Sequence, residues 1–175
     1  DEFGIEDLTE EIIVATDISM VSGFDWAGRS HIFNLQGDHL LTLEPPNPTK
    51  KEGFFGLPTK LGENIIVLSE IGAEVSPRMS GIVHLYDWNG NYLRNVSSPN
   101  PIVFGRFGSE IDIDGDIVFI SEFGGQSIGA SGPQGSGKVY IFDIEGNHLN
   151  TLMAPEPEMY ACFGASVSIS GDYAL

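Results

Sequence analysis

The sequence has a single cysteine, no long apolar run and none of the short motifs that mark the common catalytic sites. Cys162 has no disulfide partner within the chain, and zinc-type or haem-type cysteine spacings are missing. Cys162 stands beside Phe163 in an apolar stretch, which favours a core position over a nucleophilic role. The 175 residues contain no 18-residue apolar run and no signal-peptide pattern. A nucleophile elbow, a phosphate loop and a paired acid–base motif are also missing, so the sequence does not predict an enzyme.

Basic residues are also few. Eight lysines and arginines face 25 acidic residues, which gives a formal net charge of −17. Such a charge repels nucleic acid and anionic lipid, so we expect neither nucleic-acid binding nor membrane insertion. The simplest interpretation of the charge is solubility. Adaptation to salt and a requirement for divalent cations are the alternatives.

What the chain does contain is a repeat. The stretch from Gly137 to Phe163, GKVYIFDIEGNHLNTLMAPEPEMYACF, is matched by stretches that open at Gly28 and Gly81. Each has a second glycine, then a proline pair, then a Phe-Gly pair. The Phe-Gly pairs are Phe3-Gly4, Phe55-Gly56, Phe107-Gly108 and Phe163-Gly164. Their phenylalanines recur at intervals of roughly 52 to 56 residues, the period of a repeat array.

Each repeat reads as two β-hairpins. An apolar strand such as Ile65-Ile66-Val67-Leu68-Ser69 follows the Phe-Gly pair and a polar turn, and completes the first hairpin. The second hairpin turns at a sequence such as Asp87-Trp88-Asn89-Gly90, a type I turn pattern in which the glycine is free to adopt positive φ. The prolines that follow end the fourth strand. The sequence therefore predicts four strands per repeat and no helix.

A four-stranded sheet of this size cannot bury both of its faces alone, and face-to-face stacking of such sheets around an axis solves this. We therefore predict an all-β fold, a β-propeller built from four-stranded antiparallel blades of about 52 residues, of which about 3.5 are present. The whole chain, 1–175, is expected to be a single repeat array. The predicted blades are 3–54, 55–106 and 107–162, with a fourth beginning at 163–175. Because the array starts and stops within a repeat, we expect the chain to be part of something longer or of an assembly.

The repeated sequence resembles the FG-GAP repeats of microbial secreted and surface proteins, which are related to the propeller repeats of the integrin α-chain. The resemblance covers essentially the whole chain and is best from Gly137 to Asp172. It implies a propeller, usually of seven blades, in extracellular or surface-attached proteins that adhere, scaffold or bind partners. The chain departs from the family pattern after the central strand, for example at Leu68-Ser69-Glu70.

The best metal candidate is the turn Asp112-Ile113-Asp114-Gly115-Asp116. Alternate carboxylates around a glycine turn can present several oxygen ligands to Ca²⁺, so Asp112, Asp114 and Asp116 are the predicted ligands. Integrin-type calcium loops resemble this turn but add an acidic residue where this chain has Ile120. The alternative is a hairpin turn that carries solvated carboxylates. No other cofactor is predicted.

Two further features concern the ends of equivalent strands. Asp17, Glu70 and Glu122 occupy one repeat position, which predicts either an acidic ring around a channel or carboxylates that simply face water. The longest loop that follows them, 123–136, is rich in glycine and serine, and functional contacts concentrate on such loops. The predicted partner-binding residues on this loop are Phe123, Gln126, Ser127 and Gln134.

Together these features predict an extracellular or cell-surface propeller segment without catalytic activity. Its expected role is adhesion, scaffolding or surface and filament assembly through contacts with other protein chains, which include copies of itself or the remainder of its own propeller. Two alternatives stay open. One is the propeller domain of a secreted hydrolase or dehydrogenase, and the other is a calcium-stabilised binding module.

Overall fold

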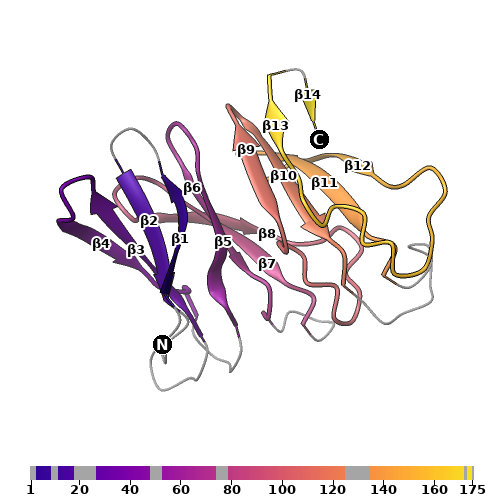
Figure 1. Ribbon diagram of the computed structural model, residues 1–175, viewed down its shortest axis with the longest axis horizontal. Coiled ribbons are helices and arrows are strands. Elements are labelled where there is room, and N and C mark those ends of the chain that lie inside the picture. The colour runs from indigo at the N-terminus through magenta and orange to yellow at the C-terminus, as the bar shows by residue number, and fades with distance from the viewer. Residues whose placement is uncertain are drawn as a thin grey trace.

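The computed structural model describes residues 3–8, 12–17, 27–47, 53–73, 79–124, 135–171 and 173–174. Within these ranges every regular element is a β-strand, which confirms the predicted all-β class (Figure 1). The strands are β1 (Phe3–Leu8), β2 (Ile12–Asp17), β3 (Arg29–Asn34), β4 (His39–Leu43), β5 (Phe55–Leu61), β6 (Ile66–Glu70), β7 (Ile82–Tyr86), β8 (Tyr92–Val96), β9 (Ile111–Asp114), β10 (Ile117–Glu122), β11 (Lys138–Asp143), β12 (His148–Leu152), β13 (Ile169–Ser170) and β14 (Tyr173–Ala174). No helix in the described ranges is long and apolar enough to cross a membrane.

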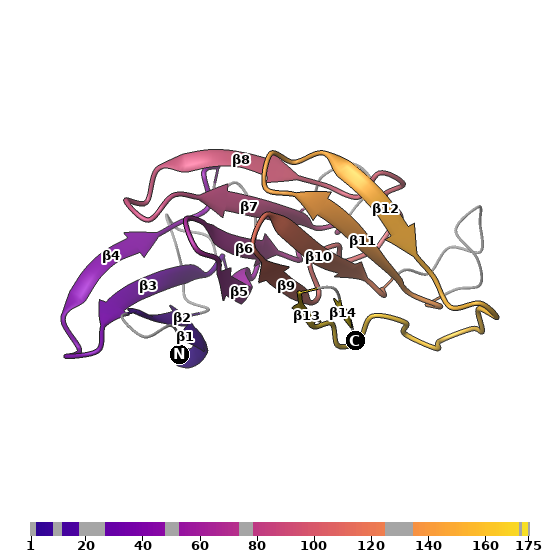
Figure 2. The same ribbon diagram turned by 90° about the horizontal axis from the view of Figure 1, so that it is seen from above.

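The strands form three antiparallel four-stranded sheets in chain order. Sheet 1 has the order β1-β2-β3-β4, sheet 2 has β5-β6-β7-β8 and sheet 3 has β9-β10-β11-β12, while β13 pairs with β14. Each sheet falls within one predicted repeat. Figure 2 shows the sheets fanned along an arc, with β4, β8 and β12 on its outer side. The first strands β1, β5, β9 and β13 are neighbours on the inner side, and the described sheets do not close into a ring.

The second hairpin of each sheet has the predicted turn. In sheet 2 the Gly90 amide donates to the Asp87 carbonyl at 3.0 Å, and Gly90 has φ of 80°. The Asp87 carboxylate accepts a hydrogen bond from the Asn91 amide at 2.9 Å, which closes the turn from the side-chain end. The turns at 34–37 and 143–146 repeat this arrangement, so the type I turn prediction is confirmed.

The core lies between the sheets. Because strand side chains alternate between faces, each sheet contributes one set of apolar residues to each neighbour. The core between sheets 1 and 2 contains Val14, Ile32, Leu43, Phe55, Ile66, Leu68 and Tyr86. The core between sheets 2 and 3 contains Ile65, Val67, Val83, Leu85, Val96, Phe107, Ile111, Val118, Ile120, Tyr140 and Phe142. Sheet 2 is therefore buried on both faces.

The Phe-Gly pair joins one sheet to the next through the backbone. Phe107 lies just before sheet 3, and Ser80 lies just before β7 of sheet 2. The Phe107 amide donates a hydrogen bond to the Ser80 carbonyl at 2.7 Å. Gly81 follows with φ of 82°, and a Cβ on Gly81 would lie 2.2 Å from the Phe107 carbonyl oxygen. The same contact recurs between Gly28 and Phe55 and between Gly137 and Phe163. We call this contact the junction; it explains why a glycine opens each repeated stretch.

Hydroxyl side chains of the second strands complete two of these junctions. Thr16 of β2 donates to the Gly56 carbonyl at 3.0 Å, and Ser69 of β6 donates to the Gly108 carbonyl at 2.7 Å. Thr16 and Ser69 are buried, so these hydrogen bonds satisfy polar groups that water does not reach. Sheets 1 and 2 therefore each hold the Phe-Gly glycine of the sheet that follows.

Candidate functional site

The carboxylates at the ends of the second strands each meet a ring on the neighbouring third strand. The ring residues occupy one repeat position, as the sequence indicates for His31, His84 and Tyr140. The three pairs are Asp17 Oδ2 with His31 Nε2 at 2.9 Å, Glu70 Oε2 with His84 Nε2 at 2.9 Å and Glu122 Oε2 with the Tyr140 hydroxyl at 2.8 Å. Each of these three pairs lies within one sheet, between its second strand (β2, β6 or β10) and its third. The inner strands β1, β5 and β9 do not carry them, so this arrangement gives no support to the acidic-ring interpretation.

The pair in sheet 1 belongs to a larger polar network on the face turned away from sheet 2. Arg29 Nε lies 3.2 Å from Asp17 Oδ2 and forms an ion pair with it. His31 Nδ1 lies 3.0 Å from the Thr42 hydroxyl, and His39 Nε2 lies 2.9 Å from the same hydroxyl. The Asp17 carboxylate and the His31 ring are mostly covered, with side chains 17% and 18% exposed. The network fixes the ring orientations on that face.

The pair in sheet 3 is the most deeply buried. Glu122 is 3% exposed and accepts hydrogen bonds from the Tyr140 hydroxyl at 2.8 Å and from Ser98 at 3.0 Å. Its other oxygen faces Gly105, where a Cβ would lie 2.4 Å away. Burial raises the pKa of the Glu122 carboxyl above its usual value, against the opposing effects of the two hydrogen bonds and of Lys138. Burial, together with the Glu122 charge, also raises the pKa of the Tyr140 hydroxyl.

The raised Glu122 pKa gives a prediction for pH. Below pH 4.5, the usual glutamate pKa, the carboxyl is protonated in both the folded and the unfolded chain. As the pH rises above that value, the unfolded chain releases the proton first, so the stability contributed by protonated Glu122 is lost up to its folded pKa. We expect the free energy of unfolding of Glu122→Gln, relative to that of the native chain, to increase with pH over this range. Urea denaturation from pH 4.5 to neutrality measures it.

A control and a contrary outcome accompany this test. Glu63→Gln removes an exposed carboxylate from the opposite end of the sheets, and the Glu122→Gln effect is judged against this variant. A difference between Glu122→Gln and the native chain that stays constant with pH would contradict a raised pKa in the folded state.

The structure does not bring the three predicted calcium ligands together. Asp112 and Asp114 accept hydrogen bonds from the backbone amides of Ile169 at 2.7 Å and Gly171 at 2.6 Å, towards the β13–β14 hairpin. Asp116 instead lines a cavity on the side of sheet 2. Across the ranges given above, no three His, Cys, Asp or Glu side chains are placed to hold a metal ion. Calcium binding is left as a prediction without a ligand set in the described residues.

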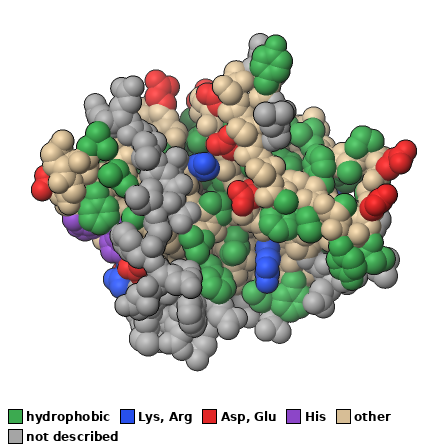
Figure 3. All heavy atoms as spheres, in the orientation of Figure 1, with side chains coloured by type: hydrophobic (Ala, Val, Ile, Leu, Met, Phe, Trp, Pro, Cys, Tyr) green, Lys and Arg blue, Asp and Glu red, His purple; other side chains and the backbone are tan. Residues whose placement is uncertain are grey.

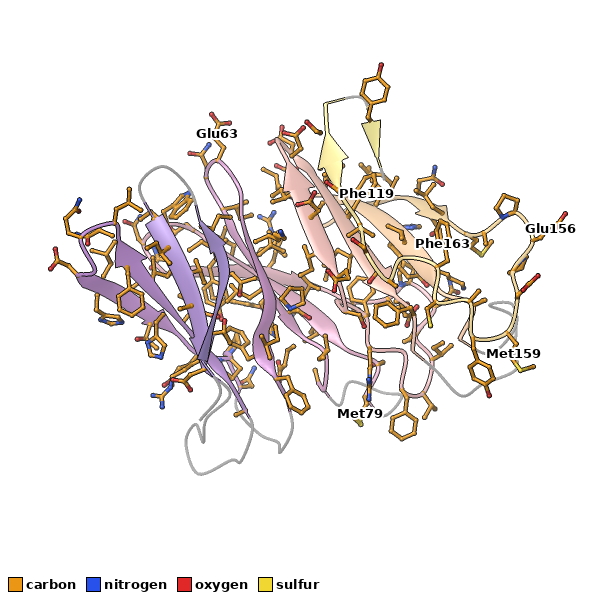
Figure 4. All side chains as sticks on the ribbon, viewed as in Figure 1. Glu63, Met79, Phe119, Glu156, Met159 and Phe163 are labelled. Carbon is orange, nitrogen blue, oxygen red and sulfur yellow. The ribbon has the colours of Figure 1, made fainter. Side chains whose placement is uncertain are left out.

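Two cavities lie between sheets 2 and 3, at opposite ends of the strands. The first, about 180 Å³, is at the hairpin-turn end, where Figure 4 labels Glu63. Its lining includes Glu63, Asp116, Glu145 and Arg94, whose guanidinium donates to the Ile144 carbonyl. The second, about 200 Å³, is at the junction end, where Figure 4 labels Met79. Its lining is Phe54, Leu57, Ile71, Gly72, Met79 and Arg106.

The predicted partner-binding residues are only partly described. Phe123 follows β10 and is half-buried, whereas Gln126, Ser127 and Gln134 lie outside the described residues. Phe123 holds the repeat position of Ile71, which lines the second cavity, so the predicted loop and that cavity are on the same end of the sheets. The cavity was not predicted from the sequence, although Phe54, Leu57 and Arg106 of its lining flank Phe-Gly pairs.

Cys162 is half-buried and is a free thiol, and it precedes Phe163 at the last junction. Its backbone has φ of 51°, as Phe54 and Arg106 have φ of 55° at the same repeat position. Left-handed backbone at a non-glycine residue is uncommon, and its recurrence before the Phe-Gly pairs at Phe55, Phe107 and Phe163 indicates that the junction requires it. The position of Cys162 is therefore set by the repeat.

No family model matches the chain, and no curated protein is significantly similar to it, so the site is interpreted from the repeats within the chain.

Proposed function

We propose that this chain is part of a β-propeller that acts without catalysis, in adhesion, scaffolding or surface assembly outside the cell, through contacts with other protein chains. The proposal is supported by the junction, which recurs with the same backbone geometry at Gly28, Gly81 and Gly137. A connection that repeats about one axis is the construction principle of a propeller.

The proposed contacts with other protein chains are supported by the two sheet faces at the ends of the array, which no described sheet covers. Ile13 and Phe33 of sheet 1, both half-buried, occupy the repeat positions of Ile66 and Tyr86, which sheet 2 packs against sheet 1. Tyr86 is 4% exposed. At the other end of the array Phe163 is half-buried, whereas Phe55 and Phe107, which hold the same repeat position, are 0% exposed. Each end of the array therefore presents one half of a sheet-to-sheet contact.

The segment after sheet 3 also exposes apolar side chains. Beyond sheet 3 the chain continues as a segment that carries Glu156, Met159 and Phe163 in Figure 4. Met153 is 53% exposed, Met159 54% and Tyr160 65%. In Figure 3 apolar side chains remain visible at this end beside acidic ones. Apolar surface of this kind favours association with a further sheet.

Sedimentation velocity tests the proposal. We expect the chain, 18.9 kDa as a monomer, to form larger species as its concentration rises. Phe33→Asp places a charge in the unmatched face of sheet 1 and is expected to abolish association while the chain remains folded. Leu40→Asp is the matched control, because Leu40 is an exposed apolar residue of the outer strand β4. A native chain that stays monomeric at every concentration, or that turns over a substrate in a broad screen, would contradict the proposed role.

A further inference from the structure

The cavity at the junction end has walls that the fold fixes in place. One side is formed by Leu57 of β5, by Phe54 just before it, and by Ile71 and Gly72 just after β6. Met79 and Arg106 complete the lining. The Arg106 amide donates to the Met79 carbonyl at 3.2 Å, next to the junction bond between Phe107 and Ser80. Four of the six lining residues are large and apolar. A preformed apolar hollow with one polar group at its rim is the usual form of a small binding site.

Arg106 is the unusual member of this lining. The structure describes five basic side chains: Arg29, Lys60, Arg94, Arg106 and Lys138. Arg29 pairs with Asp17, Arg94 donates to the Ile144 carbonyl, and Lys60 and Lys138 are attracted to Glu110 and Glu122. Arg106 is exposed, and its guanidinium makes no ion pair or hydrogen bond with the described residues. In a chain of net charge −17, an arginine that pairs with no carboxylate of the described residues is conspicuous.

We infer that this cavity binds the C-terminal residue of a partner polypeptide when that residue is apolar. The side chain of the residue enters the hollow, and its α-carboxylate pairs with Arg106. The inference rests on the proposed protein-binding role and specifies one place on the molecule where such a contact forms.

Size and charge both favour this occupant. A volume of about 200 Å³ is below the range of roughly 300–1,000 Å³ that drug-sized ligands occupy, so the hollow suits a single side chain. A guanidinium presents a planar fork of donors that matches a carboxylate with two parallel hydrogen bonds. A C-terminal residue carries its side chain and its carboxylate on the same Cα, so both contacts form without ordering a second side chain. Capture of a terminal carboxylate is an established mode of peptide recognition.

An NMR titration tests the inference. The native chain, labelled with ¹⁵N, is titrated with acetyl-Gly-Gly-Gly-Leu bearing a free C-terminal carboxylate. We expect saturable shifts of the backbone amides that line the cavity, with binding in the millimolar range because one side chain and one ion pair carry it. The amidated peptide is expected to bind about tenfold more weakly, since it lacks the charge that Arg106 recognises. Acetyl-Gly-Gly-Gly-Gly, which has the carboxylate alone, is expected to lose a similar factor.

Substitutions of single basic residues test whether Arg106 binds the peptide carboxylate. Arg106→Gln is expected to reduce affinity for the free-acid peptide about tenfold and to leave the amidated peptide unchanged. Arg106→Lys keeps the positive charge but lacks the planar guanidinium. Its affinity for the free-acid peptide is expected to lie between those of the native chain and of Arg106→Gln. Lys60→Gln removes a basic side chain outside the cavity and serves as the control, with native affinity expected. Native-like spectra of each variant show that the fold is retained.

Three results would overturn the inference: no saturable shift, equal binding of the free and amidated peptides, or shifts remote from the cavity. Equal binding of an internal acidic segment, acetyl-Gly-Leu-Asp-Gly-amide, would overturn the terminal-carboxylate specificity. Each of these outcomes leaves the proposed function untouched, because that proposal is tested by the association of the sheet faces and its response to Phe33→Asp. A monomeric chain that binds the peptide would instead contradict the proposed assembly alone.

Discussion

Replacing Gly81 with alanine is expected to destabilise the chain strongly, although it adds only one methyl group. Gly81 has φ of 82°, and an alanine held in left-handed backbone loses about 1–2 kcal/mol. The added Cβ would also lie 2.2 Å from the Phe107 carbonyl oxygen and 2.6 Å from the Phe107 nitrogen. Neither atom belongs to a flexible side chain, so sheets 2 and 3 have to separate. We expect a loss of more than about 4 kcal/mol, which places the variant among exceptionally harmful substitutions.

Gly37→Ala is the matched control for this experiment. Gly37 has φ of 87°, but a Cβ there would meet nothing within 4 Å. The control therefore reports the backbone penalty of about 1–2 kcal/mol without the overlap. Urea denaturation followed by circular dichroism compares the two variants with the native chain, and insoluble Gly81→Ala beside soluble Gly37→Ala would point the same way. Equal losses would show that the junction is not closely packed.

The strands of this fold could be predicted because the same sequence pattern recurs in each repeat. A single run such as Ile65-Ile66-Val67-Leu68-Ser69 is ambiguous between a buried strand and part of a helix. Similar apolar runs recur in each repeat after a Phe-Gly pair and a polar turn, and this recurrence predicted the strands that the structure contains. The requirement for glycine at Gly28, Gly81 and Gly137 was visible as a repeated position. Its cause, a backbone contact with a residue more than twenty positions away, was not.

The direction of the side chains explains why the three predicted calcium ligands do not lie together. Asp112 and Asp114 alternate along β9 and point to one side, as strand geometry requires. Asp116 lies beyond Gly115, whose φ of 54° turns the chain, and so it faces the other side. Spacing alone made the three look like one ligand set.

The pairing of the strand-end carboxylates was missed for a related reason. Glu70 and His84 are 14 residues apart, while Glu122 and Tyr140 are 18 apart because the intervening loop is longer. The recurring combination of an acidic residue ending one strand and a ring on the next was a usable signal. Which acidic residue lies opposite which ring depends on the register between the two strands, and the structure gives that register.

The second large effect is expected at Phe107. Its side chain is 0% exposed between sheets 2 and 3, with ring centroids 5.6 Å from Tyr140 and 5.9 Å from Phe142. Phe107→Ala removes this ring and leaves a cavity in the core, which typically costs about 3–5 kcal/mol. The measurement is the free energy of unfolding from urea denaturation at a concentration where the chain is monomeric.

Phe163→Ala is the informative comparison, because Phe163 holds the same repeat position and makes the same junction with Gly137. Phe163 is half-buried, so its loss is expected to destabilise the monomer by about 1 kcal/mol, the centre of the usual distribution. If a further sheet packs on this end in the assembled protein, the same substitution weakens association in sedimentation velocity. Equal destabilisation of the monomer by both substitutions would mean that Phe163 is already enclosed, and the C-terminal face would then have no need of a partner.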